Sequence, residues 1–359
     1  MNYSNLFDLI RWGYTNFSYN NKYGQALIPL RYFLELTYRC NLNCPYCYVG
    51  EERNKQELTT DEWKKVIDQI PFYGIITLVG GEPLLRNDFD ELLEYSCKKV
   101  MKKVHIVSNG ILLNDNHIEA FRKSKPILLS VSLDGYGENH DKNRGKNGIF
   151  EKIISNLENL KSKTPKQMID IKTIVLENNL DDLPKLYKLC DNEGFNFLSI
   201  SFLRNNNWKQ NSVLQEEFIP EYTANYPIKQ YFDMKHFKEV YKELEALSKE
   251  SKVKIRFAPK FEYLKNPLEG IEKFFQTPAD KPVNKIYKPC LYPYSDMMIN
   301  PEGYVYPCLS LKIGNVKDKS LKALYNEPKY CCFRKNLKAS GGTVGACQMC
   351  CECKIKPTF

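Results

Sequence analysis

The chain has 359 residues, of which 43% are hydrophobic and 26% are charged, and its formal net charge is +9. This is the composition of an ordinary globular protein and argues against extensive disorder, while no apolar run approaches the roughly 20 residues that span a bilayer. The lysines are interspersed with acidic residues, as in residues 237–254 (FKEVYKELEALSKESKVK). That pattern is typical of solvated helix surfaces and excludes a compact basic patch for nucleic acid.

The N-terminal residues 1–20 (MNYSNLFDLIRWGYTNFSYN) lack a basic start followed by a continuous apolar segment. They therefore do not resemble a signal peptide, and we expect a cytoplasmic, reducing location. The chain contains 13 cysteines. In a reducing compartment, that number favours metal binding or reactive thiols over a framework of disulfides.

Short β-branched segments then alternate with amphipathic segments of helical period. The repeated order of strand and helix predicts an α/β fold with a parallel sheet, closed or partly closed into a barrel of TIM type, (β/α)6. The expected strands are residues 32–36, 75–80, 103–108, 127–133, 169–176 and 197–203, and the expected helices are residues 60–70, 89–100, 115–124, 150–162 and 180–194.

These elements suggest four regions. Residues 1–30 form an N-terminal extension, 31–203 the core barrel, 204–285 a connector with one long helix at about 233–250, and 286–359 a small α+β domain. The last region holds eight of the 13 cysteines. A segment this short builds only a thin core, so a structural metal is physically reasonable there.

The loop after the first expected strand carries Cys40, Cys44 and Cys47. Structural zinc normally takes four protein ligands, whereas three thiolates around an iron–sulfur cube leave one iron free for a small chelating molecule. With Tyr46 before the third cysteine, this motif resembles the radical S-adenosylmethionine (radical SAM) superfamily. The resemblance implies that these three cysteines hold a [4Fe–4S] cluster whose free iron binds SAM.

The resemblance extends along the expected strand ends. Gly81 and Glu82 of GGEP (80–83) match the turn that binds the amino group of SAM, and a glutamate can accept from an ammonium. An arginine suits the methionine carboxylate because its planar fork donates two parallel hydrogen bonds. The residues implied as SAM contacts are Tyr46, Gly81, Glu82, Ser108, Asn109, Ser132, Arg144 and Leu203. Val175 and Leu203 are candidates to flank the adenine, although apolar strand residues are more often plain core.

Two residues are candidates for direct roles in the reaction. Asp134 lies at the same rim and would either touch substrate or ribose or stabilise the turn into Gly135. Cys332 is a candidate hydrogen donor or extra ligand, although a structural role is the simpler interpretation. The catalytic residue itself is not identified by the sequence.

The C-terminal region carries a second resemblance. Cys290, twelve residues, Gly303, four residues and Cys308 match the start of the SPASM and shorter twitch extensions, which hold auxiliary iron–sulfur clusters. This implies Cys290, Cys308, Cys347 and Cys350 as ligands, with Cys353 as the substitute for one of the last two. The chain stops at Phe359, which favours one auxiliary [4Fe–4S] cluster over two. Zinc in the same four thiolates remains the competing interpretation.

As a member of this superfamily, the protein would cleave SAM reductively to a 5′-deoxyadenosyl radical and abstract hydrogen from a peptide or a small polar substrate. The outcome would be oxidation, crosslinking or epimerisation, with an electron supplied by a reductant such as flavodoxin or ferredoxin. Leu309 follows Cys308, where related sulfatase-maturing oxidases have an aspartate, so that activity is not expected. About 30 residues precede the first strand, too few for a leader-recognition domain, so we expect a peptide substrate to need a separate recognition protein.

Two alternatives remain open. One is a dehydrogenase or epimerase of a sugar-like metabolite. The other, from a different class, is a non-catalytic iron–sulfur or zinc protein. GGEP and Arg144 argue against the second alternative, because a scaffold needs no pocket for SAM.

Overall fold

The computed structural model describes residues 13–47, 55–203, 230–278, 281–308, 311–347, 350 and 352–357. After helical residues 13–20, strands and helices alternate through the core as the sequence predicts. The strands are β1 (Arg31–Glu35), β2 (Ile75–Val79), β3 (Val104–Ser108), β4 (Leu128–Ser132), β5 (Ile169–Val175), β6 (Phe197–Phe202), β7 (Lys254–Ala258), β8 (Asp296–Ile299), β9 (Tyr304–Tyr306) and β10 (Gly314–Asn315).

The helices include the five predicted between the core strands and the long one predicted after them. They are α2 (Thr60–Asp68), α3 (Phe89–Lys99), α4 (Asp115–Ser124), α5 (Glu138–Arg144), α6 (Ile149–Lys163), α7 (Asp182–Asn192), α9 (Met234–Ser248), α10 (Pro267–Phe275), α11 (Val283–Ile286), α12 (Leu321–Tyr325) and α13 (Pro328–Ala339). Short 3-10 turns occur at Pro83–Leu85, Glu177–Asn179, Tyr292–Tyr294 and Gly345–Cys347.

Local sequence explains where these helices begin. At α2, the Thr59 side chain accepts from the backbone N–H of Glu62, and the Glu62 carboxylate accepts from the N–H of Thr59. This reciprocal cap satisfies donors that have no partner within the helix. Trp63, Val66 and Ile67 then share the buried face of α2 at helical spacing.

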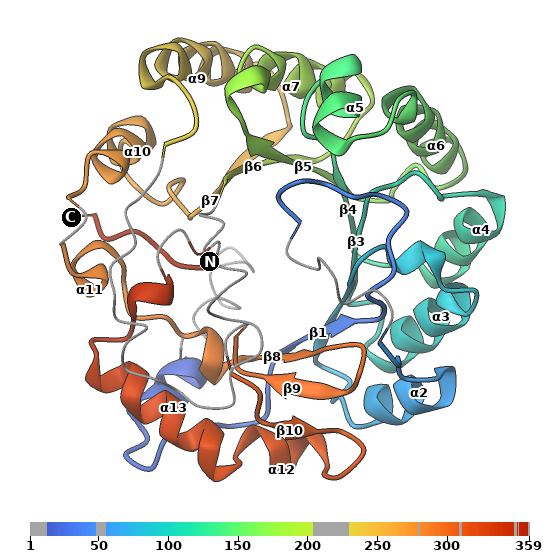
Figure 1. Ribbon diagram of the computed structural model, residues 1–359. Helices are drawn as coiled ribbons and strands as arrows, with labels where there is room; N and C mark the ends of the chain where they lie inside the picture. Colours follow the sequence, from blue (N-terminus) through green and yellow to red (C-terminus); the bar gives the residue numbers. More distant parts are fainter. Residues whose placement is uncertain are drawn as a thin grey trace.

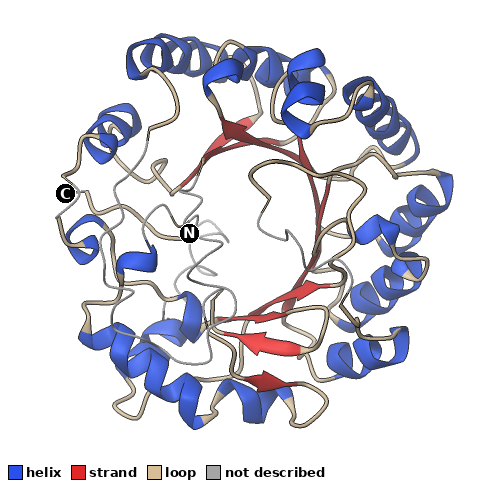
Figure 2. Cartoon of the chain, in the orientation of Figure 1, coloured by secondary structure: helices blue, strands red, loops and turns tan. Residues whose placement is uncertain are grey.

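One curved sheet forms the centre of the molecule, in the order β10-β9-β8-β1-β2-β3-β4-β5-β6-β7. Strands β1 to β7 are parallel to their neighbours, and β8 joins the free side of β1, also in parallel. Figure 1 shows the sheet curving around an interior, and Figure 2 shows helices as the outer layer. The predicted partial barrel of TIM type is therefore confirmed.

The sheet is larger than the six predicted strands. β7 lies within residues 204–285, which the sequence suggested to be a connector, and β8 lies in the C-terminal region. The sequence of β7 carries no clear strand signal, because its five residues, KIRFA, include two cations and form no apolar run. The boundaries at 203 and 286 stay predictions, and a single sheet crosses both of them.

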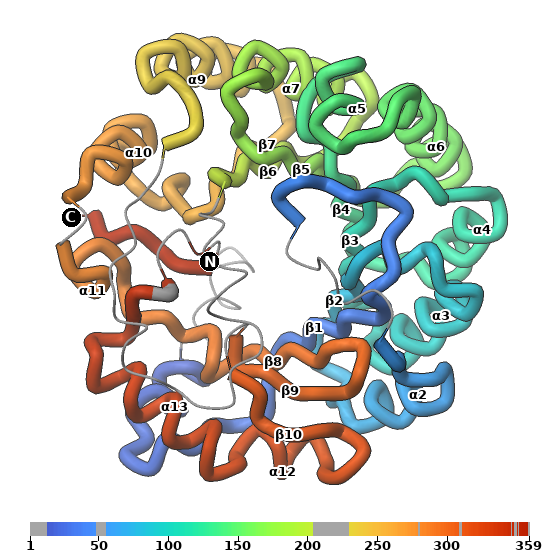
Figure 3. The backbone as a smooth tube through the Cα atoms, in the orientation of Figure 1, coloured from blue at the N-terminus to red at the C-terminus, as the bar shows by residue number. Residues whose placement is uncertain are grey.

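The C-terminal segment lies beside the open edge of this sheet. Lys354 forms a bridge with Lys260, just after β7, and Ile355 forms one with Tyr287. Figure 3 shows this part of the chain (red) running between β7 and α11. The C-terminal residues thus cover the gap between β7 and β8, which a complete barrel would close with strands.

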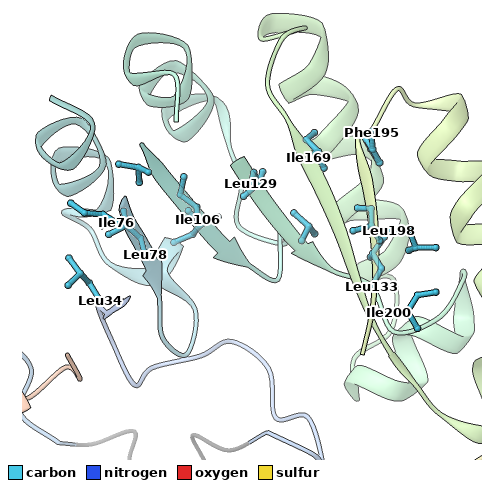
Figure 4. Close-up of a cluster of buried hydrophobic side chains, with 14 of the residues drawn as sticks. Leu34, Ile76, Leu78, Ile106, Leu129, Leu133, Ile169, Phe195, Leu198 and Ile200 are labelled. Atoms are coloured by element: carbon cyan, nitrogen blue, oxygen red, sulfur yellow. The ribbon is translucent and has the colours of Figure 1, made fainter. Parts of the chain in front are cut away.

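Alternation along the strands creates two different faces. Ile169, Ile171 and Val175 of β5 are fully buried toward the helices, whereas Lys172 between them is only half-buried. Figure 4 shows the apolar layer between strands and helices. Its labelled members are Leu34, Ile76, Leu78, Ile106, Leu129, Leu133, Ile169, Phe195, Leu198 and Ile200. Within the described residues, no helix is both long and apolar enough to cross a membrane.

Candidate functional site

The segment after β1 is held close to the turn after β2. Gly81 N–H donates to Thr37 O at 2.7 Å and Glu82 N–H to Arg39 O at 2.8 Å. A Cβ on Gly80 would lie 2.5 Å from Thr37 O, and one on Gly81 would lie 2.3 Å from Arg39 O. Only glycine permits this approach. The glycine pair therefore supports the start of the cysteine loop.

Two further charged residues fix the same segment, and the sequence analysis did not identify them. Glu57 accepts from the Thr37 hydroxyl at 2.6 Å and from the Tyr38 N–H at 2.9 Å. Arg86 is buried, donates to Leu36 O at 3.0 Å and pairs with Asp88 at 2.7 Å. Neither Glu57 nor Arg86 belongs to a recognisable sequence motif, so the spacing of residues in the sequence does not predict a role for them.

Glu82 joins the ends of β2 and β3. Its carboxylate is 0% exposed and accepts from the Ser108 hydroxyl at 2.8 Å, the Asn109 N–H at 2.7 Å and the Leu84 N–H at 3.1 Å. Burial raises the pKa of Glu82, although these hydrogen bonds oppose the shift. The resemblance of GGEP implies that this carboxylate accepts from the ammonium of SAM. The structure favours a positioning role for it instead.

The three cysteines of the loop, Cys40, Cys44 and Cys47, are half-buried. The Asn109 amide donates to Asn41 Oδ1 at 2.8 Å and lies 4.0 Å from the Cys40 sulfur, which links the loop to β3. Burial raises the pKa of the Cys40 and Cys44 thiols. A neighbouring cation or a bound metal cluster is therefore needed to stabilise the thiolates.

Arg144 is a cation beside Cys44, and its charge opposes but does not reverse the rise in the pKa of that thiol. Its Nη1 lies 3.6 Å from the Cys44 sulfur, and its Nη2 lies 2.6 Å from Oδ2 of Asp134. The Tyr46 hydroxyl donates to the same Oδ2 at 2.5 Å, and the charge of Asp134 adds to burial in raising the pKa of Tyr46. The loop, the end of β4 and the end of α5 are thus joined by one buried ion pair.

Asp134 is fixed on all sides. It is 1% exposed, and its Oδ1 accepts from the Ile174 N–H on β5 at 2.9 Å. Its own N–H donates to His140 Nδ1 at 3.0 Å; burial, together with the charge of Arg144, lowers the pKa of His140 to about 4. His140 therefore remains a neutral acceptor. This geometry favours the stabilising role of Asp134 over contact with substrate.

The C-terminal cysteines form a second group. Cys353 is 1% exposed, and its thiol contacts those of Cys290, Cys347 and Cys350, contacts that raise its pKa well above the ordinary value. Backbone bonds explain the arrangement: Lys288 N–H donates to Lys354 O at 2.9 Å, and Cys353 N–H donates to Cys350 O at 3.2 Å. Cys308 packs with Cys347 against a small apolar cluster formed by Leu311, Phe333, Leu337 and Val344.

Two family models match the chain at these two sites. Residues 34–190 match the radical SAM superfamily, and residues 290–354 match the SPASM iron–sulfur cluster-binding domain. The protein is a radical SAM enzyme with a C-terminal SPASM domain. It accordingly uses a [4Fe–4S] cluster with SAM and has auxiliary iron–sulfur binding in the SPASM domain.

Relatives of this radical SAM enzyme differ in the reactions that their names describe. It is 29% identical to an AdoMet-dependent heme synthase of Methanosarcina barkeri over 342 residues, 90% of each chain. A PqqA peptide cyclase of Bradyrhizobium diazoefficiens is 35% identical over 115 residues, 31% of this chain and 30% of the relative. Streptococcus suis SuiB, solved with its precursor peptide SuiA, has the same fold, with a TM-score of 0.63 at 18% identity over 96% of this chain and 74% of that one.

The rim of the radical SAM domain fits an anionic cluster and a carboxylate. In the part of the chain that the structure describes, Arg144 Nε and Asn41 Nδ2 are buried donors without a partner, and both belong to residues beside the cysteine loop. A buried donor without a partner destabilises the fold. A bound iron–sulfur cluster and SAM would supply acceptors for these two atoms. The donor set therefore suits a thiolate-held cluster with SAM beside it.

Other predicted contacts fall into two groups. Ser132 and Leu203 are half-buried at the ends of β4 and β6, on the interior face. Val175 is 0% exposed on the helix side of β5, which contradicts the predicted contact with adenine.

Cys332 is exposed on α13 in the outer layer of helices (Figure 1), so we withdraw it as a catalytic candidate. Leu309 lies outside the described residues, as does Cys351, a further cysteine between Cys350 and Cys353.

Replacing Arg144 by alanine is expected to have two separable effects. SAM affinity should fall by about ten- to a hundredfold, since a charge-assisted contact is lost. Stability should fall by about 3 kcal/mol, because the buried carboxylate of Asp134 loses its cation. Equilibrium dialysis of SAM, iron analysis and chemical unfolding measure these effects, with Arg122→Ala on the surface of α4 as the control.

The double variant Asp134→Asn/Arg144→Ala separates the two roles of Arg144. Neutralising Asp134 removes the unpaired charge, so the double variant should recover much of the lost stability while SAM binding stays weak. If Arg144→Ala binds SAM as tightly as the wild type, the arginine serves only the ion pair.

Proposed function

We propose that Cys40, Cys44 and Cys47 hold the SAM cluster and that the protein abstracts hydrogen from a substrate bound inside the barrel. The observation that carries this proposal is the convergence of the cysteine loop, the Asp134–Arg144 pair and the Glu82 hydrogen bonds at one rim. The cluster and SAM together supply a 5′-deoxyadenosyl radical. The chain supplies binding, orientation and exclusion of water.

Each rim residue has a proposed task toward SAM. Carbonyls of the Gly81 turn accept from the ammonium, while Ser132 and Arg144 bind the methionine carboxylate. Asn109 and Ser108 lie toward the ribose, and Leu203 toward the adenine. Glu82 and Asp134 hold these groups in place, and Tyr46 connects the loop to Asp134.

We propose a peptide as the first substrate class and oxidation or crosslinking as the outcome. The names of the peptide cyclase and of the SuiB–SuiA complex support this choice. An auxiliary cluster can accept the electron that a substrate radical loses. A reductant such as flavodoxin or ferredoxin supplies an electron to the SAM cluster.

A tetrapyrrole with carboxylate groups is the second candidate. The match to the heme synthase covers 90% of both chains, whereas the match to the peptide cyclase covers under a third. The two classes are distinguished by the site of hydrogen abstraction, either on an amino-acid residue or on a ring substituent.

The test uses anaerobically reconstituted enzyme with SAM and dithionite. Candidate substrates are short peptides encoded beside the gene and iron coproporphyrin III, each carrying deuterium at its C–H positions. We expect 5′-deoxyadenosine to form and to carry deuterium from one candidate. Absence of 5′-deoxyadenosine under all conditions would refute the proposed function, and deuterium from the tetrapyrrole alone would replace the first substrate class by the second.

A further inference from the structure

A row of polar side chains crosses the interior face of the sheet below the rim. Ser132 of β4 pairs in register with Lys172 of β5, Lys172 with Ser199 of β6, and Ser199 with Arg256 of β7. Ser132 is also a proposed SAM contact. Lys172 therefore lies one strand away from SAM, and Arg256 lies two strands further around the barrel.

The two cations project into the barrel. His105 is on β3, and the charges of Lys172, Arg31 and Arg256 contribute, after burial, to lowering its pKa well below the ordinary value. These four residues are on β3, β5, β1 and β7, none of which are neighbours in the sheet. Ile171 and Phe257 beside them are buried, so alternation along β5 and β7 turns Lys172 and Arg256 toward the interior face.

The carboxylates of the interior already have partners. Arg31 pairs with Asp296 and, at 3.2 Å, with Glu352, and Lys260 lies 3.5 Å from Glu352. Asp170 accepts from the Ser199 hydroxyl at 2.7 Å and from the Ser130 hydroxyl at 2.9 Å. Ser130 also bonds to the neutral ring of His105 at 2.8 Å.

Lys172 and Arg256 are not paired with these carboxylates. In the part of the chain that the structure describes, neither forms an ion pair or a hydrogen bond. The Arg256 guanidinium carbon lies 3.5 Å from the centre of the Phe197 ring. This contact holds the guanidinium plane in place and leaves its N–H groups free to donate to a ligand. The nearby Glu262 accepts from the Phe257 N–H at 3.2 Å. Burial raises its pKa, although the charges of Lys260 and Arg256 oppose the shift.

Lys172 and Arg256 are half-buried, and a carboxylate between them would give both a partner of opposite charge. We propose that Lys172 and Arg256 bind a carboxylate of the substrate and so place it beside SAM. The assignment deepens the proposed function and rests on it. Both candidate classes carry this group, as an acidic side chain or terminus of a peptide or as an acid substituent of a tetrapyrrole.

The experiment measures binding of defined probes to reconstituted enzyme with SAM. One pair is coproporphyrin III, a planar tetracarboxylate, and its tetramethyl ester. The other pair is a pentapeptide of glutamate and a pentapeptide of glutamine. The variant is Lys172→Met/Arg256→Met, which removes both charges but keeps comparable side-chain volume. The control is Lys123→Met/Lys188→Met, since these lysines are 58% and 55% exposed on the outer helices.

We expect at least one carboxylate probe to bind the wild type and the control alike, and to bind the double variant about tenfold more weakly or worse. The ester and glutamine probes should bind weakly and show no difference between variants. SAM affinity, iron content and thermal unfolding should be unchanged in the double variant, with Lys172→Gln and Arg256→Gln as milder variants. Whichever carboxylate probe binds more tightly identifies the source of the group.

Equal binding of the carboxylate probes to wild type and double variant would overturn the assignment, as would a wild type that binds neither probe. A loss of SAM affinity in the double variant would also overturn it, because the cations would then serve the methionine carboxylate. Failure of the wild type to form 5′-deoxyadenosine counts against the proposed function alone, since probe binding does not require SAM cleavage.

Discussion

Enzyme in which Cys40, Cys44 and Cys47 are all replaced by alanine is expected to form no 5′-deoxyadenosine. The loop cluster loses every protein ligand in this variant, so the site that binds and reduces SAM is not assembled. The measurement is anaerobic SAM cleavage with dithionite after reconstitution, followed by chromatography of the nucleoside product. The expected change is complete loss and not a reduced rate.

The control for this variant is Cys331→Ala/Cys332→Ala. These thiols belong to α13, and their replacement should leave SAM cleavage intact. Iron analysis gives a second readout, because the triple variant should keep about half of the iron in an unchanged auxiliary cluster. SAM cleavage by the triple variant at the wild-type rate would refute the assignment of the loop.

The core barrel could be predicted because its signal is local. A segment such as IDIKTIV in β5 is β-branched and short, and the amphipathic segment after it has helical period. The rim residues could be predicted for a related reason. Parallel strands place their carboxyl ends at one edge, so Glu82, Asn109 and Asp134 had to lie near the cysteine loop.

Pairing between distant segments could not be predicted in this way. β8 pairs with β1 through a register that places Asp296 opposite Arg31, about 265 residues apart in the chain. Nothing in the local period of either strand specifies that partner. The same limit applies to Lys354 and Lys260, whose bridge covers the open edge of the sheet.

The roles of individual side chains were harder to predict than their positions. Glu82 was correctly expected at the rim, but its role depends on where the Ser108 hydroxyl and the Asn109 N–H point. Asp134 was ambiguous until Arg144, Tyr46 and Ile174 were seen to satisfy its carboxylate. Lys172 had no signal beyond a cation in an apolar strand, because the absence of a partner is a property of the fold.

The ligand set of the auxiliary cluster stays a prediction, and the structure suggests one change to it. The spacing of the cysteines implied Cys290, Cys308, Cys347 and Cys350, with Cys353 as a substitute. The structure brings Cys353 into contact with Cys290, Cys347 and Cys350, and Cys308 packs beside Cys347 against the adjacent apolar cluster. We therefore expect Cys353→Ala to lose the auxiliary cluster as completely as Cys290→Ala does.

The loss should also weaken the fold of the SPASM domain. Residues 353–355 are held against residues 260 and 287–288 by backbone bonds, and metal binding by these thiols would couple to the formation of that structure. Each variant should therefore show lower iron content, a lower unfolding midpoint for the C-terminal region and faster proteolysis there. SAM cleavage at the loop cluster should persist, since Cys40, Cys44 and Cys47 are untouched.

Cys308→Ala is the matched comparison, because it removes one thiol from the same region without touching the contacts of Cys353. We expect this variant to retain auxiliary iron and its visible spectrum. If Cys308→Ala loses the cluster while Cys353→Ala keeps it, the set implied by the sequence spacing is correct and the contacts of Cys353 are incidental. If protein isolated without reconstitution contains zinc instead of iron, the site is a structural zinc site. Such a site cannot accept an electron during substrate oxidation.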